Sequence, residues 1–292
     1  MPGGKGGAMS VCDAAASGSL DEVKRCLHDG EDIDQRNSEG QSALLAAAKG
    51  KHWDVVDYLL DEGASVEGDV FVDAAVSGNV KLVRSLLDRG VDVDSTDWLG
   101  NTALIKVVQR HDGYYGDGPV VLVRLLLESG ANVDSVYTPF LIRTGIAGEG
   151  DLGYTRGDPE TTALVYALQS SSRIAKMLIE AGADVNVGHY HNGEYIGAIS
   201  YAQSDDEVLR MMLERGADAN TKDRVGHTLL MTASFRGRVG AVKLLIDHGA
   251  DVGAKRKDGA TAFKLADNPD VKRLLRTSRI SRLFGRSKAS PV

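Results

Sequence analysis

Apolar residues along the chain recur in pairs of short helical blocks, and each pair ends in the same way. Residues 177–186 give the clearest example. Residues 177–179 supply an apolar helix face, Gly182 can adopt the left-handed conformation that ends a helix, and residues 183–186 lead away as an extended exit. Close versions of this stretch occur at residues 25–34, 58–67, 85–94, 125–134, 211–220 and 244–253.

The glycines in these exits recur about every 33 residues, which is typical of a stacked repeat protein. They are Gly30, Gly63, Gly90, Gly130, Gly182, Gly216 and Gly249. Between two exits lie two amphipathic blocks, such as residues 43–49 and 53–61, with a short break between them. We therefore predict an all-α fold, a solenoid of about eight helix–turn–helix repeats with short β-hairpin turns, capped at both ends.

A second motif precedes the first helix of many repeats. It occurs at residues 42–45, 102–105, 162–165, 228–231 and 261–264. Together with the exits, these segments resemble the ankyrin repeat, whose pattern is Thr-Pro-Leu-His, two helices and Gly-Ala-Asp-Val-Asn. None of the segments keeps the proline or the histidine of that pattern. Because the histidine ties neighbouring turns together in the family, the resemblance implies turns that are less tightly hydrogen-bonded here.

The repeats divide the chain into three parts. We expect a disordered, glycine-rich N-terminus at residues 1–9, a repeat array at 10–276 and a basic C-terminal tail at 277–292. The expected repeats are residues 10–36, 37–68, 69–96, 97–136, 137–187, 188–222, 223–255 and 256–276.

Irregular spacing marks three places where the repeats should depart from the pattern, and the sequence of the sixth repeat marks a fourth. The second spacing is short, which predicts that the third repeat lacks its hairpin and leaves a notch before Val70. The third spacing is long because residues 110–119 extend a helix–helix turn. The fourth is longest and predicts an inserted glycine-rich loop at residues 137–160, on the hairpin side. Residues 195–203 predict a distorted first helix in the sixth repeat.

The formal net charge of −7 hides an asymmetry. Residues 253–292 are rich in Lys and Arg, so the rest of the chain is strongly acidic, and this argues against nucleic acid bound along the array. Apolar residues on one helical face of the tail, Ile280, Leu283 and Phe284, lie among arginines. The tail could contact an acidic protein or an anionic membrane surface, direct nuclear import, or be a disordered solubilising end.

Two further features bear on the compartment. No apolar run approaches the ~20 residues of a transmembrane segment, and residues 1–7 lack the apolar core of a signal peptide. Cys12 and Cys26 are too few for a disulfide framework and fall on apolar helix faces. We therefore expect an intracellular protein, cytoplasmic or nuclear or both.

Candidate chemistry is sparse. The loop at residues 143–153 lacks the Gly-Lys-Ser/Thr ending of a phosphate-binding loop, and neither His189 with His191 nor Asp112 with Asp117 has further ligands at metal-site spacing. We expect no cofactor, no metal and no enzymatic activity. The resemblance marks Asn186 as a position that an asparaginyl hydroxylase could modify, although an ordinary repeat asparagine is the simpler interpretation.

The resemblance also implies that hairpin tips and first-helix ends contact a partner protein. The predicted contacts are Arg36, Glu39, Gln41, Trp98, Leu99, Asn101, Arg110, Arg224, His227, Phe235 and Arg236, with Ser38, Lys49, Gln109 and Val225 beside them. Trp98 is unusual because this turn position is normally polar, so it either anchors a partner or folds back onto the long loop.

Three functions remain open. We favour a non-catalytic scaffold or adaptor that binds a protein in its concave groove. The alternative is a regulatory subunit or inhibitor of an enzyme that uses the loop at residues 137–160. An enzyme with a site in that loop is the third and least favoured hypothesis, since the loop offers no base and nucleophile pair.

Overall fold

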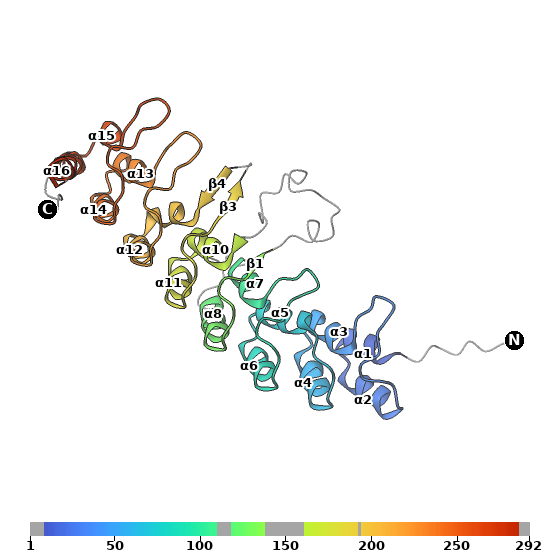
Figure 1. Cartoon of the computed structure of the whole chain (residues 1–292). Coiled ribbons are helices and arrows are strands. Elements are labelled where there is room, and N and C mark those ends of the chain that lie inside the picture. The colour runs from blue at the N-terminus through green and yellow to red at the C-terminus, as the bar shows by residue number, and fades with distance from the viewer. Residues whose placement is uncertain (1–8, 110–117, 138–160, 192–193, 286–292) are drawn as a thin grey trace, which may run out of the picture. The chain divides into compact units, whose positions relative to one another are not determined.

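A computed structural model describes residues 9–109, 118–137, 161–191 and 194–285 (Figure 1). These residues form two compact bodies. The first body ends at Asn132, and the second runs from Val133 to the C-terminal helix. Residues 1–8, the greater part of the inserted loop and residues 286–292 lie outside the described part of the chain.

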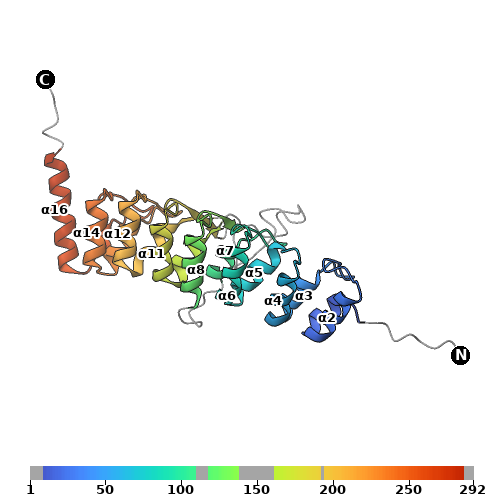
Figure 2. The ribbon, with the colours of Figure 1, turned by 90° about the horizontal axis from the view of Figure 1, so that it is seen from below.

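The first body contains four helix pairs. Its inner helices lie next to one another, α1 on α3, α3 on α5 and α5 on α7, and the outer helices return along their backs (Figures 1 and 2). The inner helices are α1 (Val11–Ser17), α3 (Ala43–Gly50), α5 (Gly68–Val76) and α7 (Ala103–Gln109), and the outer ones are α2 (Leu20–His28), α4 (Trp53–Asp61), α6 (Val80–Asp88) and α8 (Gly118–Glu128).

The second body begins with a short antiparallel pair, in which β1 (Val136–Tyr137) places Val136 opposite Thr162 of β2 (Thr161–Thr162). A hairpin of β3 (Gly188–His191) and β4 (Glu194–Gly197) follows two helices, and a 3-10 helix η1 (Ala198–Ser204) comes next. The α-helices are α10 (Ala163–Ser170), α11 (Ser172–Glu180), α12 (Asp206–Glu214), α13 (Leu229–Phe235), α14 (Val239–Asp247), α15 (Ala262–Leu265) and α16 (Pro269–Gly285).

Packing between helices stabilises these short elements. An isolated helix of fewer than about 12 residues is marginal in water, so each helix here depends on its buried face. Completely buried side chains come from inner and outer helices alike, for example Phe71, Ile105 and Leu178. The helix starts are capped as well: the Ser42 hydroxyl accepts the Leu45 N–H at 3.2 Å.

One side chain in most exits accepts a backbone N–H from the following repeat. The Asp34 carboxylate accepts the N–H of Ser65, and the series continues from Asp94 to Asn132, Asp134 to Asp184, Asn186 to Asp218 and Asn220 to Asp251, with distances between 2.7 and 3.1 Å. Neighbouring turns are thus joined by hydrogen bonds without the family's histidine. We call this series of acceptors the Asx ladder.

The predicted solenoid of helix pairs is confirmed within each body, and so are two of its irregularities. Helix α5 begins at Gly68, immediately after the preceding exit, so the third repeat has no hairpin before its first helix. Helix η1 shows that the first helix of the sixth repeat is distorted. The last helix crosses an expected boundary, because α16 runs to Gly285 and so continues past residue 276, where we placed the end of the repeat array.

The described helices include none that is both long and apolar enough to cross a membrane.

Candidate functional site

The hairpin tip before α7 presents a tryptophan on a fixed backbone. Trp98 is 63% exposed. Next to it, the Asp97 carboxylate accepts the N–H groups of Leu99 at 3.0 Å and Asn101 at 2.8 Å. The backbone N–H of Trp98 donates to the Asp69 carboxylate at 2.7 Å. These bonds hold the turn against the start of α5, so the indole is presented from a defined position.

A groove runs from this tip along α5. Asp69, Asp73 and Val76 lie at helical spacing on one face of α5, between α3 and α7. The upper part is a hollow of about 210 Å³ beside Trp98 and Lys106. We call this surface the α5 groove; its residues are Lys49, Lys51, Asp69, Asp73, Val76, Ser77, Trp98, Leu99 and Lys106.

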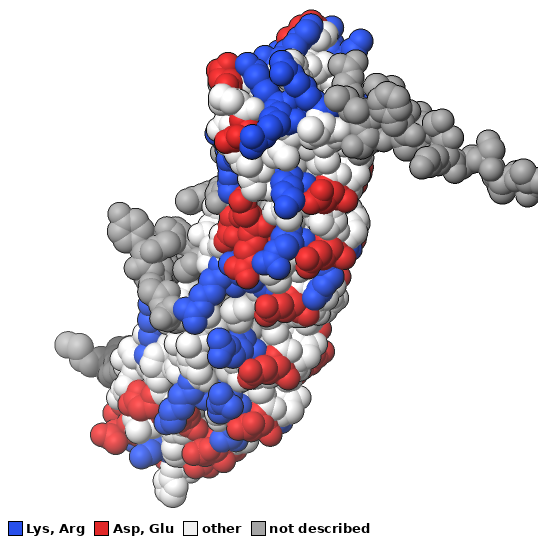
Figure 3. All heavy atoms as spheres, turned by 90° about the vertical axis from the view of Figure 1, so that its left-hand side faces the viewer, with Lys and Arg blue, Asp and Glu red and all other residues white. Residues whose placement is uncertain are grey.

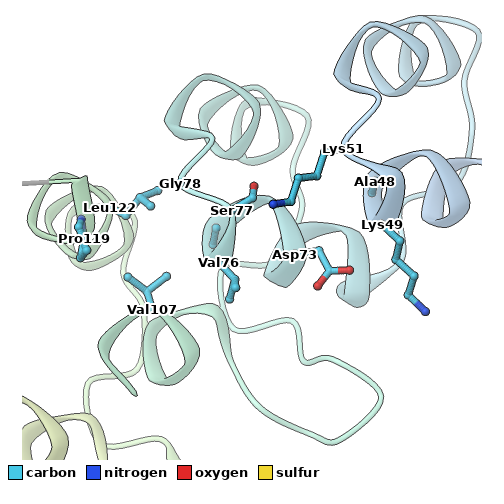
Figure 4. A pocket seen from close by; sticks show the side chains of 11 residues that line it. Ala48, Lys49, Lys51, Asp73, Val76, Ser77, Gly78, Val107, Pro119 and Leu122 are labelled. Carbon is cyan, nitrogen blue, oxygen red and sulfur yellow. The ribbon is translucent and has the colours of Figure 1, made fainter. Parts of the chain in front are cut away.

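The lower part of the α5 groove opens into a larger hollow of about 550 Å³ at the C-terminal ends of α3 and α5 (Figure 4). Its apolar wall includes Ala48, Val107 and Leu122, all of which are buried. Figure 4 shows the Lys51 side chain extending toward Ser77 at the rim. The site therefore combines an apolar recess with charged side chains at its edge.

Some charged side chains of the groove have partners of opposite charge close by, and others do not. Burial raises the pKa of the Asp73 carboxyl, and the negative charge of Asp69 raises it further, whereas the positive charge of Lys49 opposes the shift. Lys106 lies 3.8 Å from the Asp97 carboxylate. Lys49 and Lys51 are exposed, and neither makes an ion pair within 4.0 Å in the described part of the chain. Two cationic groups at the rim are therefore available to a ligand.

The second body presents its own exposed apolar side chains in the seventh repeat. Phe235, at the end of α13, is 66% exposed, and Val225, on the turn before it, is 47% exposed. The Asp223 carboxylate fixes that turn by accepting the N–H groups of Val225 and His227. Arg224 and Arg236 are exposed as well.

The remaining predicted contacts divide by exposure. Arg36 and Glu39 are exposed, and Arg36 pairs with Glu67 at 3.1 Å, while Gln41 is half-buried. Asn101 requires a correction, because it is 0% exposed and its side-chain amide donates to Asp97 within the turn. In this structure its side chain supports the tip from within and offers no exposed surface. Arg110 lies outside the described residues.

Asn186 is exposed, and both the nitrogen and the oxygen of its side-chain amide make hydrogen bonds. Its nitrogen donates to the Gly216 carbonyl at 3.2 Å, and its oxygen accepts the Asp218 N–H at 3.1 Å. The side chain is therefore part of the Asx ladder, and its hydroxylation stays a prediction.

The other candidate chemistry finds no support in the residues described. No group of three or more His, Cys, Asp or Glu side chains there could hold a metal ion. The loop at residues 143–153, Asp112, Asp117 and the side chains of His189 and His191 lie outside that part of the chain. Cys12 and Cys26 are buried free thiols whose pKa values are raised, mainly by burial, as in inert structural cysteines.

Positive charge gathers at the C-terminal end of the second body. Figure 3 shows Lys and Arg side chains crowded at the end where α15 and α16 lie, whereas charges of both signs alternate elsewhere on the face it shows. The basic residues of this end with described side chains are Lys255, Arg256, Lys257, Lys264, Lys272, Arg273 and Arg276.

Our sequence interpretation missed most of the α5 groove. Of its rim cations it named Lys49 but not Lys51, and it overlooked Asp73 and Val76. The short spacing between Gly63 and Gly90 could have pointed to this groove. A repeat without its hairpin leaves part of the face of its inner helix uncovered beyond the neighbouring turn, so the residues of that face, at Asp69, Asp73 and Val76, were the ones to examine.

Comparison with known proteins agrees with this architecture. The family model for ankyrin repeats (three copies) matches residues 11–97, 71–189 and 196–281. The potassium channel AKT2/3 of Arabidopsis thaliana is 34% identical over 129 residues, which cover 43% of this chain and 15% of the channel. The putative ankyrin repeat protein YahD of Escherichia coli is 25% identical over 159 residues, covering 41% of this chain and 78% of that protein.

Among solved structures, the ankyrin repeat domain of Bcl-3 is similar with a TM-score of 0.46 and 21% identity, covering 92% of this chain and 99% of that one. Of the two relatives above, the chain spans only a small part of the plant channel AKT2/3 but most of the bacterial protein YahD. The family model covers most of the sequence. The chain therefore belongs to the ankyrin repeat family.

Proposed function

We propose that this protein is a non-catalytic scaffold or adaptor that binds a partner protein through its hairpin tips and inner-helix surfaces. The observation that carries the proposal is Trp98, which is 63% exposed on a turn fixed by the carboxylates of Asp97 and Asp69. Membership of the ankyrin repeat family also supports protein binding, because ankyrin repeats generally mediate protein–protein interaction.

The physical advantage of such a tip is preorganisation. A tryptophan buries a large apolar area on binding and has only two side-chain torsions to order. Since the turn is already hydrogen-bonded, little backbone entropy is lost when a partner closes over it. Phe235 and Val225 offer a comparable contact in the second body.

The test is capture of the partner by the purified chain, followed by mass spectrometry. Trp98→Ala should sharply reduce the recovery of proteins that the wild type enriches, because central tryptophans often contribute 2 kcal/mol or more to an interface, roughly a 30-fold change in affinity. Far-UV circular dichroism should be unchanged. Equal recovery by the wild type, Trp98→Ala and a Trp98→Ala/Arg236→Ala variant would place the binding surface elsewhere.

A second candidate function is regulation or inhibition of a partner enzyme through the inserted segment, whose position the β1–β2 pair marks. Tyr137 lies opposite Thr161, so the inserted segment begins and ends at one hairpin position. In this function the partner's activity should fall when the protein is added, and a chain in which residues 138–160 are replaced by a short linker should still bind but no longer inhibit.

A further inference from the structure

We propose that the α5 groove binds an extended acidic segment of the partner, with one apolar side chain in the larger hollow and a carboxylate beside Lys49 and Lys51. This inference rests on the proposed function and names the chemistry of the partner. It concerns a surface in the first body alone.

The size and lining of the larger hollow favour an apolar side chain. Its volume of about 550 Å³ exceeds the ~30 Å³ share of one liquid water many times over. The half-buried side chains of Val76 and Pro119 supply apolar surface to it, backed by the buried Ala48, Ala75, Val107 and Leu122, and such a wall offers water few hydrogen bonds. An aliphatic or aromatic side chain would bury its surface there without leaving a polar group unpaired.

The charges around the groove select an acidic ligand. Lys49 and Lys51 are exposed cations on the rim that make no ion pair within 4.0 Å among the residues described, and Lys49 interacts electrostatically with Asp73. Two of the three acids lining the groove already hold hydrogen bonds, because Asp69 accepts the backbone N–H of Trp98 and Asp97 accepts two N–H groups of its turn. The third, Asp73, is the carboxylate that faces the two lysines in the larger hollow. A carboxylate placed at the rim therefore gains two cations, which complements the site electrostatically.

The same acids argue against a nucleic acid as the ligand. Asp69, Asp73 and Asp97 all line the upper hollow beside Trp98. A phosphate backbone following the groove would meet these carboxylates, whereas a peptide can pass them with its neutral backbone or with a basic residue. The groove thus fits a peptide whose acidic residue lies at the Lys51 end.

The length of the groove fixes a spacing within that peptide. Asp69 and Ser77 stand at opposite ends of the α5 face, and a helix rises about 1.5 Å per residue, so they are separated by about 12 Å along the axis. An extended peptide covers that distance in about four residues. A residue that contacts Trp98 should therefore lie about four positions from the apolar anchor.

The experiment is a selection from a displayed library of random dodecapeptides against the full chain. We expect enriched peptides to carry an apolar anchor next to Asp or Glu, with a second apolar residue about four positions away. A fluorescent synthetic peptide of the enriched sequence then reports affinity. Replacing its anchor by Ala, or its acid by the corresponding amide, should weaken binding about tenfold, and raised salt should weaken it too.

Protein variants test the same contacts from the other side. Lys49→Glu with Lys51→Glu should weaken the peptide about tenfold or more, because attraction at the rim becomes repulsion. The matched control is Lys81→Glu with Lys243→Glu, which makes the same change in net charge at two exposed positions, neither of which lines the groove. This control should bind like the wild type.

The outcomes separate this inference from the proposed function. Enriched peptides without an acid, peptides that bind the Lys49→Glu/Lys51→Glu variant as tightly as the wild type, or no enrichment at all would overturn the inference. If protein capture still depends on Trp98 in those cases, the scaffold function stands without it. Loss of the Trp98 dependence overturns the scaffold function itself.

Discussion

A β-carbon on Gly68 would lie 2.2 Å from the carbonyl oxygen of Thr96. The first residue of α5 therefore lies directly against the backbone that leads into the next repeat's hairpin tip. The third repeat has lost its own hairpin, and the neighbouring turn occupies the space so released. Trp98, two residues after Thr96, is placed over the start of α5 by this contact and by its bond to Asp69.

Gly68→Ala should destabilise the first body. At an ordinary first helical position alanine would be favourable, but here its β-carbon meets backbone that cannot rotate away, and overpacking of this kind costs about 1–3 kcal/mol. Both tryptophans, Trp53 and Trp98, belong to the first body, so tryptophan fluorescence during urea unfolding measures it selectively.

The control for this substitution is Gly253→Ala. A β-carbon there meets only the Asp251 carboxylate, at 3.4 Å, which is ordinary contact. We expect this variant to leave urea unfolding followed by circular dichroism, which reports on both bodies, unchanged. A Gly68→Ala protein as stable as the wild type would mean that the Thr96 turn moves freely on α5.

Asp73→Asn should stabilise the first body at neutral pH. Burial, together with Asp69, raises the pKa of Asp73, so the ionised carboxylate is less favourable in the folded protein than in the unfolded chain. This cost is present above the folded pKa and absent below the unfolded value of about 3.9. Because Asp73 is only half-buried and solvent screens its charge, we expect a gain of no more than about 0.5 kcal/mol at pH 7 that shrinks as the pH falls toward 4, measured by the same fluorescence transition. A gain that is independent of pH would point to packing instead of charge.

Ser65→Ala tests the first step of the Asx ladder. The Ser65 hydroxyl donates to the Asp34 carboxylate at 2.6 Å, and this bond, with the Ser65 N–H, lowers the pKa of Asp34. The stabilisation is therefore complete above the unfolded pKa of about 3.9 and is lost as the pH falls through the lower folded pKa. We expect the variant to lose about 0.5 kcal/mol at pH 7, because the pair is exposed, and to match the wild type in strong acid. An NMR titration should show the Asp34 pKa rising in the variant.

Asn220→Asp should weaken the second body. The amide of Asn220 accepts the Asp251 N–H at 2.7 Å and donates to the Gly249 carbonyl at 3.3 Å. A carboxylate keeps the first bond but places negative charge against the carbonyl, at a cost of about 1 kcal/mol. Urea unfolding followed by circular dichroism measures the loss. Asp247→Asn, an exposed amide–acid exchange at the end of α14, should have no comparable effect.

Local patterns in the sequence predicted the helices well because each repeat is folded by short-range rules. An apolar face, a capping residue and a glycine exit specify the pairs α1 with α2 and α3 with α4. Spacing alone also located the missing hairpin before α5. Contacts within one repeat and the next are nearly all that such a fold contains.

The residues that contact a partner were harder to predict, because the exposure of each depends on the direction in which its own side chain points. Asn101 occupies a tip position that is polar and suited to contact, yet its amide turns inward to Asp97. The α5 groove was missed because it arises between three repeats, from residues that look ordinary in each. The array boundary after residue 276 does not end α16, because no proline or glycine follows Leu275 before Gly285 and the described helix extends to that residue.

The Asx ladder has a consequence for how such a chain can change its length. Each rung joins a side chain to a backbone N–H, which every residue except proline provides, so adjacent repeats need no matched pair of side chains. The rung from Asp134 to Asp184 forms across a separation of 50 residues, at 2.9 Å, as the others do across shorter ones. Repeats joined in this way do not depend on particular side chains of their neighbours. A segment can therefore be inserted between two repeats, or removed, while the hydrogen bond between their exits still forms.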